Sequence, residues 1–139
     1  MDALEVLKKA ESLGGMERKE AMLNVLRTAR KFGCKFSPGG GKVGGFNIRF
    51  GSLSYAVMDV NTEGTLFLHI KPHPGKPISE DYRTEANEYI SSLDGIKIKN
   101  GPIHHYGQVE AEVENIPADS IEAFLDYTVG HINRTYYQQ

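Results

Sequence analysis

Residues 53–70 read LSYAVMDVNTEGTLFLHI, and this stretch predicts a β-hairpin near the middle of the chain. Two runs, Leu53 to Val60 and Thr65 to Ile70, are the predicted strands. In the second run apolar and other side chains alternate with a period of two, as a strand with one buried face requires. The sequence Asn-Thr-Glu-Gly at 61–64 supplies the turn chemistry between the two strands.

The residues before this hairpin predict one more strand, a glycine-rich loop and two helices. Residues 46–50 alternate Phe, Ile and Phe with Asn and Arg, which predicts a strand. Residues 37–45, SPGGGKVGG, have almost no apolar surface to bury and predict a flexible loop. Residues 1–33 carry two apolar stripes at helical spacing, separated by Gly14-Gly15, and therefore predict a pair of helices. Asp2 and Glu5 have the spacing of an N-terminal capping box.

The residues after the hairpin predict a helix, a second β region and a closing helix. Three prolines exclude regular structure from 71–77, and a helix is expected to begin at Ser79. Residues 96–99 alternate and lead into Asn100-Gly101, a strong hairpin signal. Whether 96–114 form two or three strands is open, because Gly107 interrupts the second run. The final stripe runs from Ile121 nearly to the end of the chain.

The predicted fold class is α+β, with two N-terminal helices followed by β-β-β-α-β-β-α. Strands that come in hairpin groups favour an antiparallel sheet with helices packed on one face. One domain is expected over 1–139, made of a helical pair at 1–33, the flexible loop at 37–45 and an α+β core at 46–139. A chain of 139 residues with 40% apolar and 24% charged residues has the composition of an ordinary globular domain.

Charge and cysteine content narrow the classes of function. The chain has 16 Lys and Arg against 18 Asp and Glu, so no excess positive charge attracts nucleic acid, and nucleic acid is not expected as a partner. Only the lysines at 71, 76, 97 and 99 favour that reading. The single cysteine, Cys34, favours a reducing compartment and a packing role. Acids near the N-terminus and the lack of a long apolar run predict a cytoplasmic protein without a membrane partner.

A glycine pattern offers one candidate ligand site. Gly39, Gly41 and Gly44 match the spacing of a dinucleotide-binding loop, with Lys42 among them. Such glycines let backbone amides approach a phosphate closely. A dinucleotide-binding loop follows a strand and precedes a helix, whereas here a helix is predicted before the pattern and a strand after it. A Walker loop is excluded as well, because Val43 stands where that motif needs Ser or Thr. A flexible linker is the favoured interpretation, and phosphate binding is the alternative.

The histidines offer a candidate metal site. Imidazole is a common metal ligand, and His69, His73 and His105 would converge if the two β regions are neighbours. Only one of the adjacent His104 and His105 can join, because neighbouring strand residues point to opposite faces. No cysteine pair or helical His pair supports such a site, and no cofactor is expected. Surface histidines are the ordinary alternative. The glutamates at 110, 112 and 114 are predicted to line the solvated side of a strand.

The closing segment 116–127, IPADSIEAFLDY, resembles the hairpin exit and last helix of type III secretion chaperones and the related YbjN-like proteins. The resemblance extends over Phe46 to Tyr137 and rests on the order of the elements. It implies a non-enzymatic homodimer that binds a segment of another protein, and it carries over no site residue. The second N-terminal helix and the glycine loop depart from that group.

The leading hypothesis is therefore a non-catalytic adaptor or chaperone-like protein, homodimeric, that binds a protein or peptide through a sheet face or an exposed edge. The alternative is a small metal- or phosphate-dependent enzyme that uses the histidines and the glycine loop.

Overall fold

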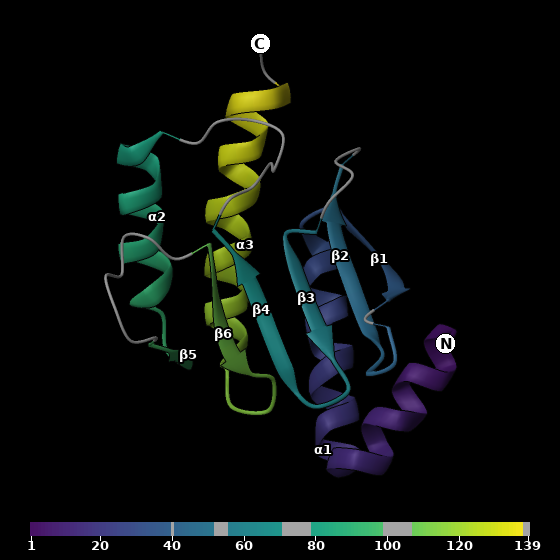
Figure 1. Ribbon diagram of the computed structural model, residues 1–139. Helices are drawn as coiled ribbons and strands as arrows, with labels where there is room; N and C mark the ends of the chain where they lie inside the picture. Colours follow the sequence, from purple (N-terminus) through teal and green to yellow (C-terminus); the bar gives the residue numbers. More distant parts are fainter. Residues whose placement is uncertain (40, 52–55, 71–78, 99–106, 138–139) are drawn as a thin grey trace.

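An antiparallel sheet carries the fold, in a computed structural model that describes residues 1–39, 41–51, 56–70, 79–98 and 107–137. The order of elements is α1, β1 to β4, α2, β5, β6 and α3. The six strands of the described residues lie in the order β1-β2-β3-β4-β6-β5, and every neighbouring pair is antiparallel. Helices α1 and α3 cover one face of this sheet, and α2 lies beside α3 (Figure 1). The predicted α+β class and antiparallel sheet are confirmed.

The predicted pair of N-terminal helices is wrong. A single helical element, α1 (Ala3–Lys31), spans the region and bends sharply at Gly15, whose φ of 78° lies in the left-handed region. Gly14-Gly15 therefore kinks the helix and does not end it in a loop. The helix starts as predicted, with a capping box in which Asp2 and Glu5 each accept a hydrogen bond from the other's backbone.

The structure also contains a first strand, β1 (Cys34–Gly39), that the sequence-based prediction did not include. It pairs with β2 (Gly45–Phe50) in a register that sets Pro38 opposite Phe46 and Gly39 opposite Gly45. Both ends of the segment predicted as a loop, 37–39 and 45, thus belong to strands. Two features make this possible: β1 is an edge strand, where proline is tolerated, and the Phe36 ring packs edge-on against Phe46 at 5.7 Å between centroids.

Strands β3 and β4 continue the meander that begins with β1 and β2, and β5 and β6 form a second antiparallel pair beside β4. Strands β3 (Met58–Asn61) and β4 (Thr65–His69) are the predicted hairpin, although β3 is shorter than expected and residues 52–55 lie outside the described part. Helix α2 (Glu80–Ser91) begins after Ser79, which caps it as predicted. The short β5 (Ile96–Lys97) and β6 (Gln108–Glu112) are the described strands of 96–114, and β6 lies between β4 and β5.

Alternation along the strands separates a core face from an open face. Residues of the core face are nearly or wholly buried under α1 and α3 (Ala118–Ile132), which continues into a π-helical turn at Asn133–Tyr137. Val109, Ala111 and Val113, which alternate with the glutamates expected on the solvated side, are all buried. The inward-facing residues of the four central strands are Phe46, Ile48, Met58, Val60, Leu66, Leu68, Val109 and Ala111.

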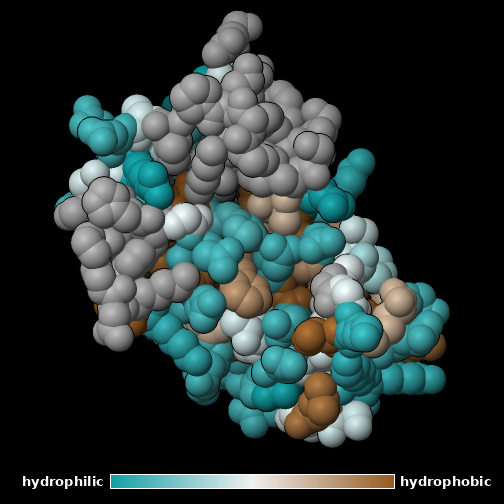
Figure 2. All heavy atoms as spheres, viewed as in Figure 1, coloured by the Kyte–Doolittle hydropathy of each residue, from teal (hydrophilic) through white to brown (hydrophobic). Residues whose placement is uncertain are grey.

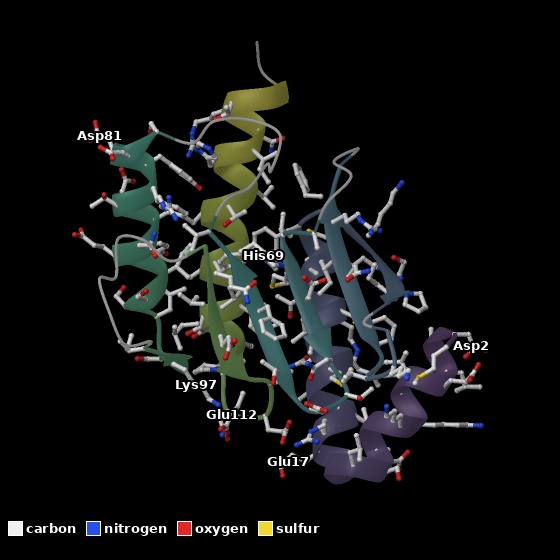
Figure 3. The ribbon with its side chains drawn as sticks, in the orientation of Figure 1. Asp2, Glu17, His69, Asp81, Lys97 and Glu112 are labelled. Carbon is white, nitrogen blue, oxygen red and sulfur yellow. The ribbon has the colours of Figure 1, made fainter. Side chains whose placement is uncertain are left out.

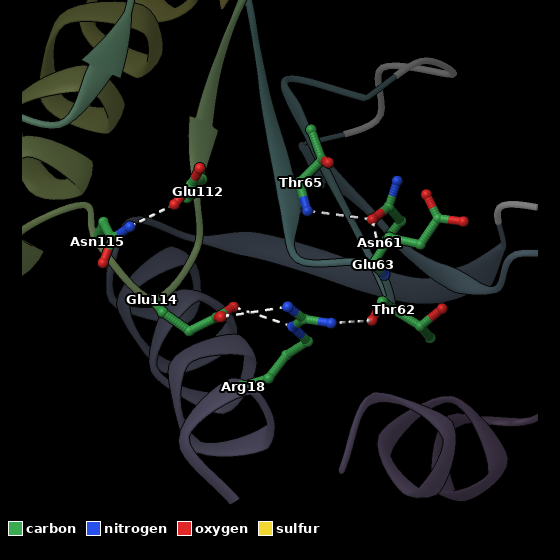
Figure 4. A network of polar contacts seen from close by, with 8 residues as sticks. All are labelled: Arg18, Asn61, Thr62, Glu63, Thr65, Glu112, Glu114 and Asn115. Atoms are coloured by element: carbon green, nitrogen blue, oxygen red, sulfur yellow. Dashed lines mark hydrogen bonds and ion pairs between the residues drawn. The ribbon is translucent and has the colours of Figure 1, made fainter. Parts of the chain in front are cut away.

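A charged contact fixes the bend of α1 to the sheet. Just after the kink, Arg18 donates two hydrogen bonds to the carboxylate of Glu114, at 3.0 and 3.3 Å (Figure 4). It donates a third to the backbone oxygen of Thr62 in the turn between β3 and β4. Glu114 was expected to lie on the solvated side of a strand. It instead follows β6 and pairs with Arg18, whose guanidinium joins three segments of the chain.

Candidate binding surface on the open face of the sheet

One row of side chains crosses the open face of the sheet. Strand register sets Asn47 opposite Asp59, Asp59 opposite Phe67, and Phe67 opposite Glu110. Each of the four alternates with buried neighbours, so all four project away from α1 and α3. We call these four residues the central row. Phe67 is the aromatic member of the row, is half-buried and has a carboxylate on either side.

His69 lies next to the central row and is paired with Asp59. Its Nε2 is 2.7 Å from Asp59 Oδ2, and the two side chains are 23% and 31% exposed. The His69 side chain projects from β4 on the open face (Figure 3). The other carboxylate oxygen, Oδ1, is buried and has no hydrogen-bond partner in the described part of the chain. Asp59 thus orients the imidazole through Nε2, which leaves Nδ1 as its remaining polar atom.

A hollow of about 390 Å³ lies over this part of the sheet. Its walls come from β2, β3, β4 and β6 and from the connection between β1 and β2. Figure 2 shows apolar surface among hydrophilic side chains over the middle of this face. The residues that line the hollow are Val43, Gly45, Phe46, Asn47, Asp59, Val60, Asn61, Phe67 and Gln108.

Two amide side chains of the hollow lack a hydrogen-bond partner among the described residues. Within the described ranges, no hydrogen bond engages the side-chain amides of Asn47 or Gln108. Asn61 differs, because its Oδ1 accepts from the backbone N–H groups of Glu63 and Thr65 at 3.0 and 3.1 Å and so forms the turn. An aromatic ring beside a few unpaired polar groups is the usual composition of a small binding site.

The glycine pattern lies in a hairpin connection. Gly39 ends β1, while Gly41 and Gly44 have positive φ values of 58° and 81°. The backbone oxygen of Lys42 accepts from Lys9 Nζ at 2.7 Å, so a helix side chain already engages this segment. The segment joins two antiparallel strands, and no helix N-terminus follows to attract an anion.

Gly39 has a different structural reason for being glycine. A Cβ atom at this position would collide with the side-chain amide of Asn47, its neighbour on β2. The glycine therefore leaves the room that Asn47 occupies beside the hollow. Gly45 is restricted too, because a Cβ there would collide with the backbone oxygen of Val60.

Only one of the three histidines predicted to form a metal site, His69, lies among the described residues. His69 lies at the end of β4, whereas His73, His104 and His105 are outside the described residues. Among the residues that the structure describes, no three His, Cys, Asp or Glu side chains converge as metal ligands would. His131 lies elsewhere, on α3, where its ring stacks on Tyr82 at 3.7 Å between centroids.

Sequence reasoning missed Asp59, Phe67 and Gln108. The available hint was Phe67, a large aromatic residue in phase with His69 on the face of a strand opposite Leu66 and Leu68. Its neighbours could not be found without strand register, which joins residues 47, 59, 67 and 110 across four strands.

No known family model, curated protein or solved structure matches this chain. In the described ranges, none of the helices combines the length and the apolar character needed to cross a membrane.

Proposed function

We propose that this protein is a non-catalytic binding protein that holds a segment of another protein against the open face of its sheet. The observation that carries the proposal is the hollow around Phe67, where an aromatic ring lies with the amides of Asn47 and Gln108, which make no hydrogen bond in the described part of the chain. Helices α1 and α3 pack on the other face of the sheet (Figure 1).

The order of elements supports the same class. From Phe46 onward the chain runs three strands, a helix, two strands and a helix, which is the order on which the resemblance to type III secretion chaperones and YbjN-like proteins rests. Homodimerisation and a cytoplasmic site of action belong to this proposal as well. The buried thiol of Cys34 suits a reducing compartment.

Site-specific photo-crosslinking tests the binding surface. The photoreactive residue benzoylphenylalanine would replace Phe67 in the full chain, and the protein would be irradiated in the cells that produce it. We expect one or a few discrete protein adducts, with the crosslinked peptide of the partner identified by mass spectrometry. The matched control carries the same residue in place of Asp126, which is exposed on α3. Equal adducts from both positions, or none from position 67, would contradict the proposal.

Light scattering after size exclusion tests the homodimer separately. A mass of twice 15.4 kDa that persists on dilution is expected. A monomer at high protein concentration would remove the dimer from the proposal and leave the binding surface to the crosslinking result.

One observation favours an enzyme as the second candidate. The 2.7 Å contact between His69 and Asp59 is the arrangement in which a carboxylate orients a general base. Chromogenic ester and phosphate substrates would be assayed with the wild type, His69→Gln and the control His131→Gln. Turnover lost only in His69→Gln would support the enzyme. Turnover that is absent, or equal in all three proteins, would count against it.

A further inference from the structure

We propose that the hollow binds one arginine side chain of the partner segment, with the guanidinium stacked on Phe67 and hydrogen-bonded to Asp59. The inference rests on the proposed function and names the chemistry of its partner. It follows from the size of the hollow, its charge and the geometry of its unpaired groups.

The size suits a single side chain. A volume of about 390 Å³ is near the lower end for ligand sites, which commonly hold roughly 300–1,000 Å³. Open-face side chains of neighbouring strands line it, Phe67 among them, together with the buried core residues Phe46 and Val60. Such a depression accepts a planar group of a few atoms on a flexible stem better than a folded surface.

The charge favours a cation. Asp59 is the charged residue among those that line the hollow, and Glu110 lies on the other side of Phe67 in the central row. Two basic side chains of the open face are held by other groups. Lys97 Nζ is 3.1 Å from a Glu112 oxygen, and Arg49 donates to the hydroxyl of Ser37 at 3.2 Å.

The acceptors favour arginine over lysine. The groups available are the Oδ2 atom of Asp59, since Oδ1 is buried, and the amide oxygens of Asn47 and Gln108. A guanidinium carries five N–H donors in one plane and can stack flat on an aromatic ring while it bonds several acceptors at its edge. An ammonium is a compact, strongly hydrated point charge, and it leaves more of these acceptors unpaired.

His69 acts as a positioning residue in this arrangement. Its Nε2 holds Oδ2 of Asp59 at 2.7 Å and so restricts the rotation of the carboxylate beside the ring. The His69→Gln variant keeps a donor on a shorter, uncharged side chain. We expect it to weaken arginine binding less than Asp59→Asn, which removes the charge itself.

Amide chemical shifts in a two-dimensional NMR titration test the proposal on the full chain. The probe is N-acetyl-arginine methylamide, compared with the matching lysine compound and with citrulline, which has the shape of arginine without its charge. We expect saturable shifts at residues 47, 59, 67 and 108 with the arginine probe, weaker ones with lysine and none with citrulline. Asp59→Asn is expected to raise the Kd roughly tenfold, because a charge-assisted hydrogen bond is lost.

Two further variants test whether the Phe67 ring contributes to arginine binding and whether the effect of Asp59 is specific to its position. Phe67→Leu keeps an apolar side chain on an exposed strand face but removes the ring, and it is expected to weaken arginine binding as well. Asp126→Asn removes one negative charge from the outer side of α3 and should leave the Kd unchanged. A dispersed amide spectrum for each variant confirms that it is folded.

The inference is overturned if the three probes shift the same residues equally, if the shifts map to another surface, or if none occurs up to the solubility limit of the arginine probe. An Asp59→Asn protein that binds like the wild type also overturns it. These outcomes leave the proposed function intact when benzoylphenylalanine at position 67 still yields a specific protein adduct. Loss of that adduct, with arginine binding retained, would instead remove the proposed function and leave a small-molecule site.

Discussion

The Arg18 guanidinium and the Glu114 carboxylate face each other with two N–H···O hydrogen bonds of 3.0 and 3.3 Å, although the residues are 96 positions apart. Their side chains are only 18% and 21% exposed. Because Arg18 also donates to the backbone oxygen of Thr62, this one side chain joins α1, the turn after β3 and the segment after β6. Bidentate geometry and partial burial distinguish the pair from an ordinary surface ion pair.

Removal of either partner should destabilise the protein. We expect Arg18→Gln and Glu114→Gln each to lower the free energy of unfolding by about 1–2 kcal/mol, because a partly buried charge loses its partner. Urea denaturation of the two single variants and the double variant would give the coupling energy. The matched control is Arg27→Gln, whose partner Glu20 is 3.8 Å away on an exposed face. An effect of Arg27→Gln as large as that of Arg18→Gln would contradict this account.

A side chain at Gly64 should disturb the same contact. Gly64 has a φ of 90°, and a Cβ there would lie 2.8 Å from Arg18 Nε and 2.9 Å from Glu114 Oε1. Gly64→Ala is expected to lower the free energy of unfolding by about 2–3 kcal/mol, since backbone strain and displacement of the ion pair add.

The variant Gly41→Ala separates these two causes. Gly41 also has a positive φ, 58°, but a Cβ there would meet none of the described residues within 4 Å. We expect a loss of about 1–2 kcal/mol from the backbone alone. Thermal or urea unfolding would compare the two proteins, and equal losses would show that the Arg18 contact adds nothing at Gly64.

Stability should fall in mild acid because of His131. Burial, followed by the nearby charge of Arg134, lowers the pKa of His131 below 6.5. The unfolded chain therefore binds a proton more readily than the folded one, so stability decreases as pH falls from about 6.5 through the folded-state pKa. His131→Phe keeps a ring against Tyr82 and removes the titration. Urea unfolding at pH 7.5 and 5.5 should show a smaller loss in the variant than in the wild type, and identical losses would refute the assignment.

The thiol of Cys34 should react slowly in the folded protein. Burial raises the pKa of Cys34 to about 11, and the residue is 6% exposed at the start of β1. At pH 8 the thiol is almost entirely protonated, and the thiolate is the reactive form. We expect slow reaction with a disulfide reagent in buffer and rapid, stoichiometric reaction in urea. Rapid reaction of the native protein would mean that β1 opens readily or that the thiol is accessible.

The start of α1 and the turn 61–64 could be predicted because each depends on neighbours a few residues apart. Asp2 and Glu5 bond each other's backbone over three positions, and Asn61 accepts from the N–H groups of Glu63 and Thr65. Hydrogen bonds of this kind depend only on residues a few positions apart, so a short stretch of sequence is enough to predict them. The core face of β6 could be predicted for a similar reason, since alternation is a local property.

The errors fall where long-range packing overrides local preference. Gly14-Gly15 has the composition of a helix end, and Gly15 is non-helical, yet no loop separates the two helical segments, and the contact of Arg18 with Glu114 ties the second segment to the sheet. Residues 37–39 have the composition of a loop, yet pairing with β2 makes them a strand. A glycine- and proline-rich segment gains little by itself from an extended conformation, and here hydrogen bonds to β2 supply the stabilisation.

The chain of residues alone therefore establishes an antiparallel α+β protein, its main turns and the inward face of its strands, because these depend on propensities and periodicities within a few residues. Only the tertiary structure sets Asn47, Asp59, Phe67 and Glu110 in one row and brings His69 to 2.7 Å from Asp59. Strand register is a collective result of core packing, and a shift of one residue would turn every one of these side chains to the other face. The candidate binding surface is for that reason a property of the fold, which no single stretch of the sequence contains.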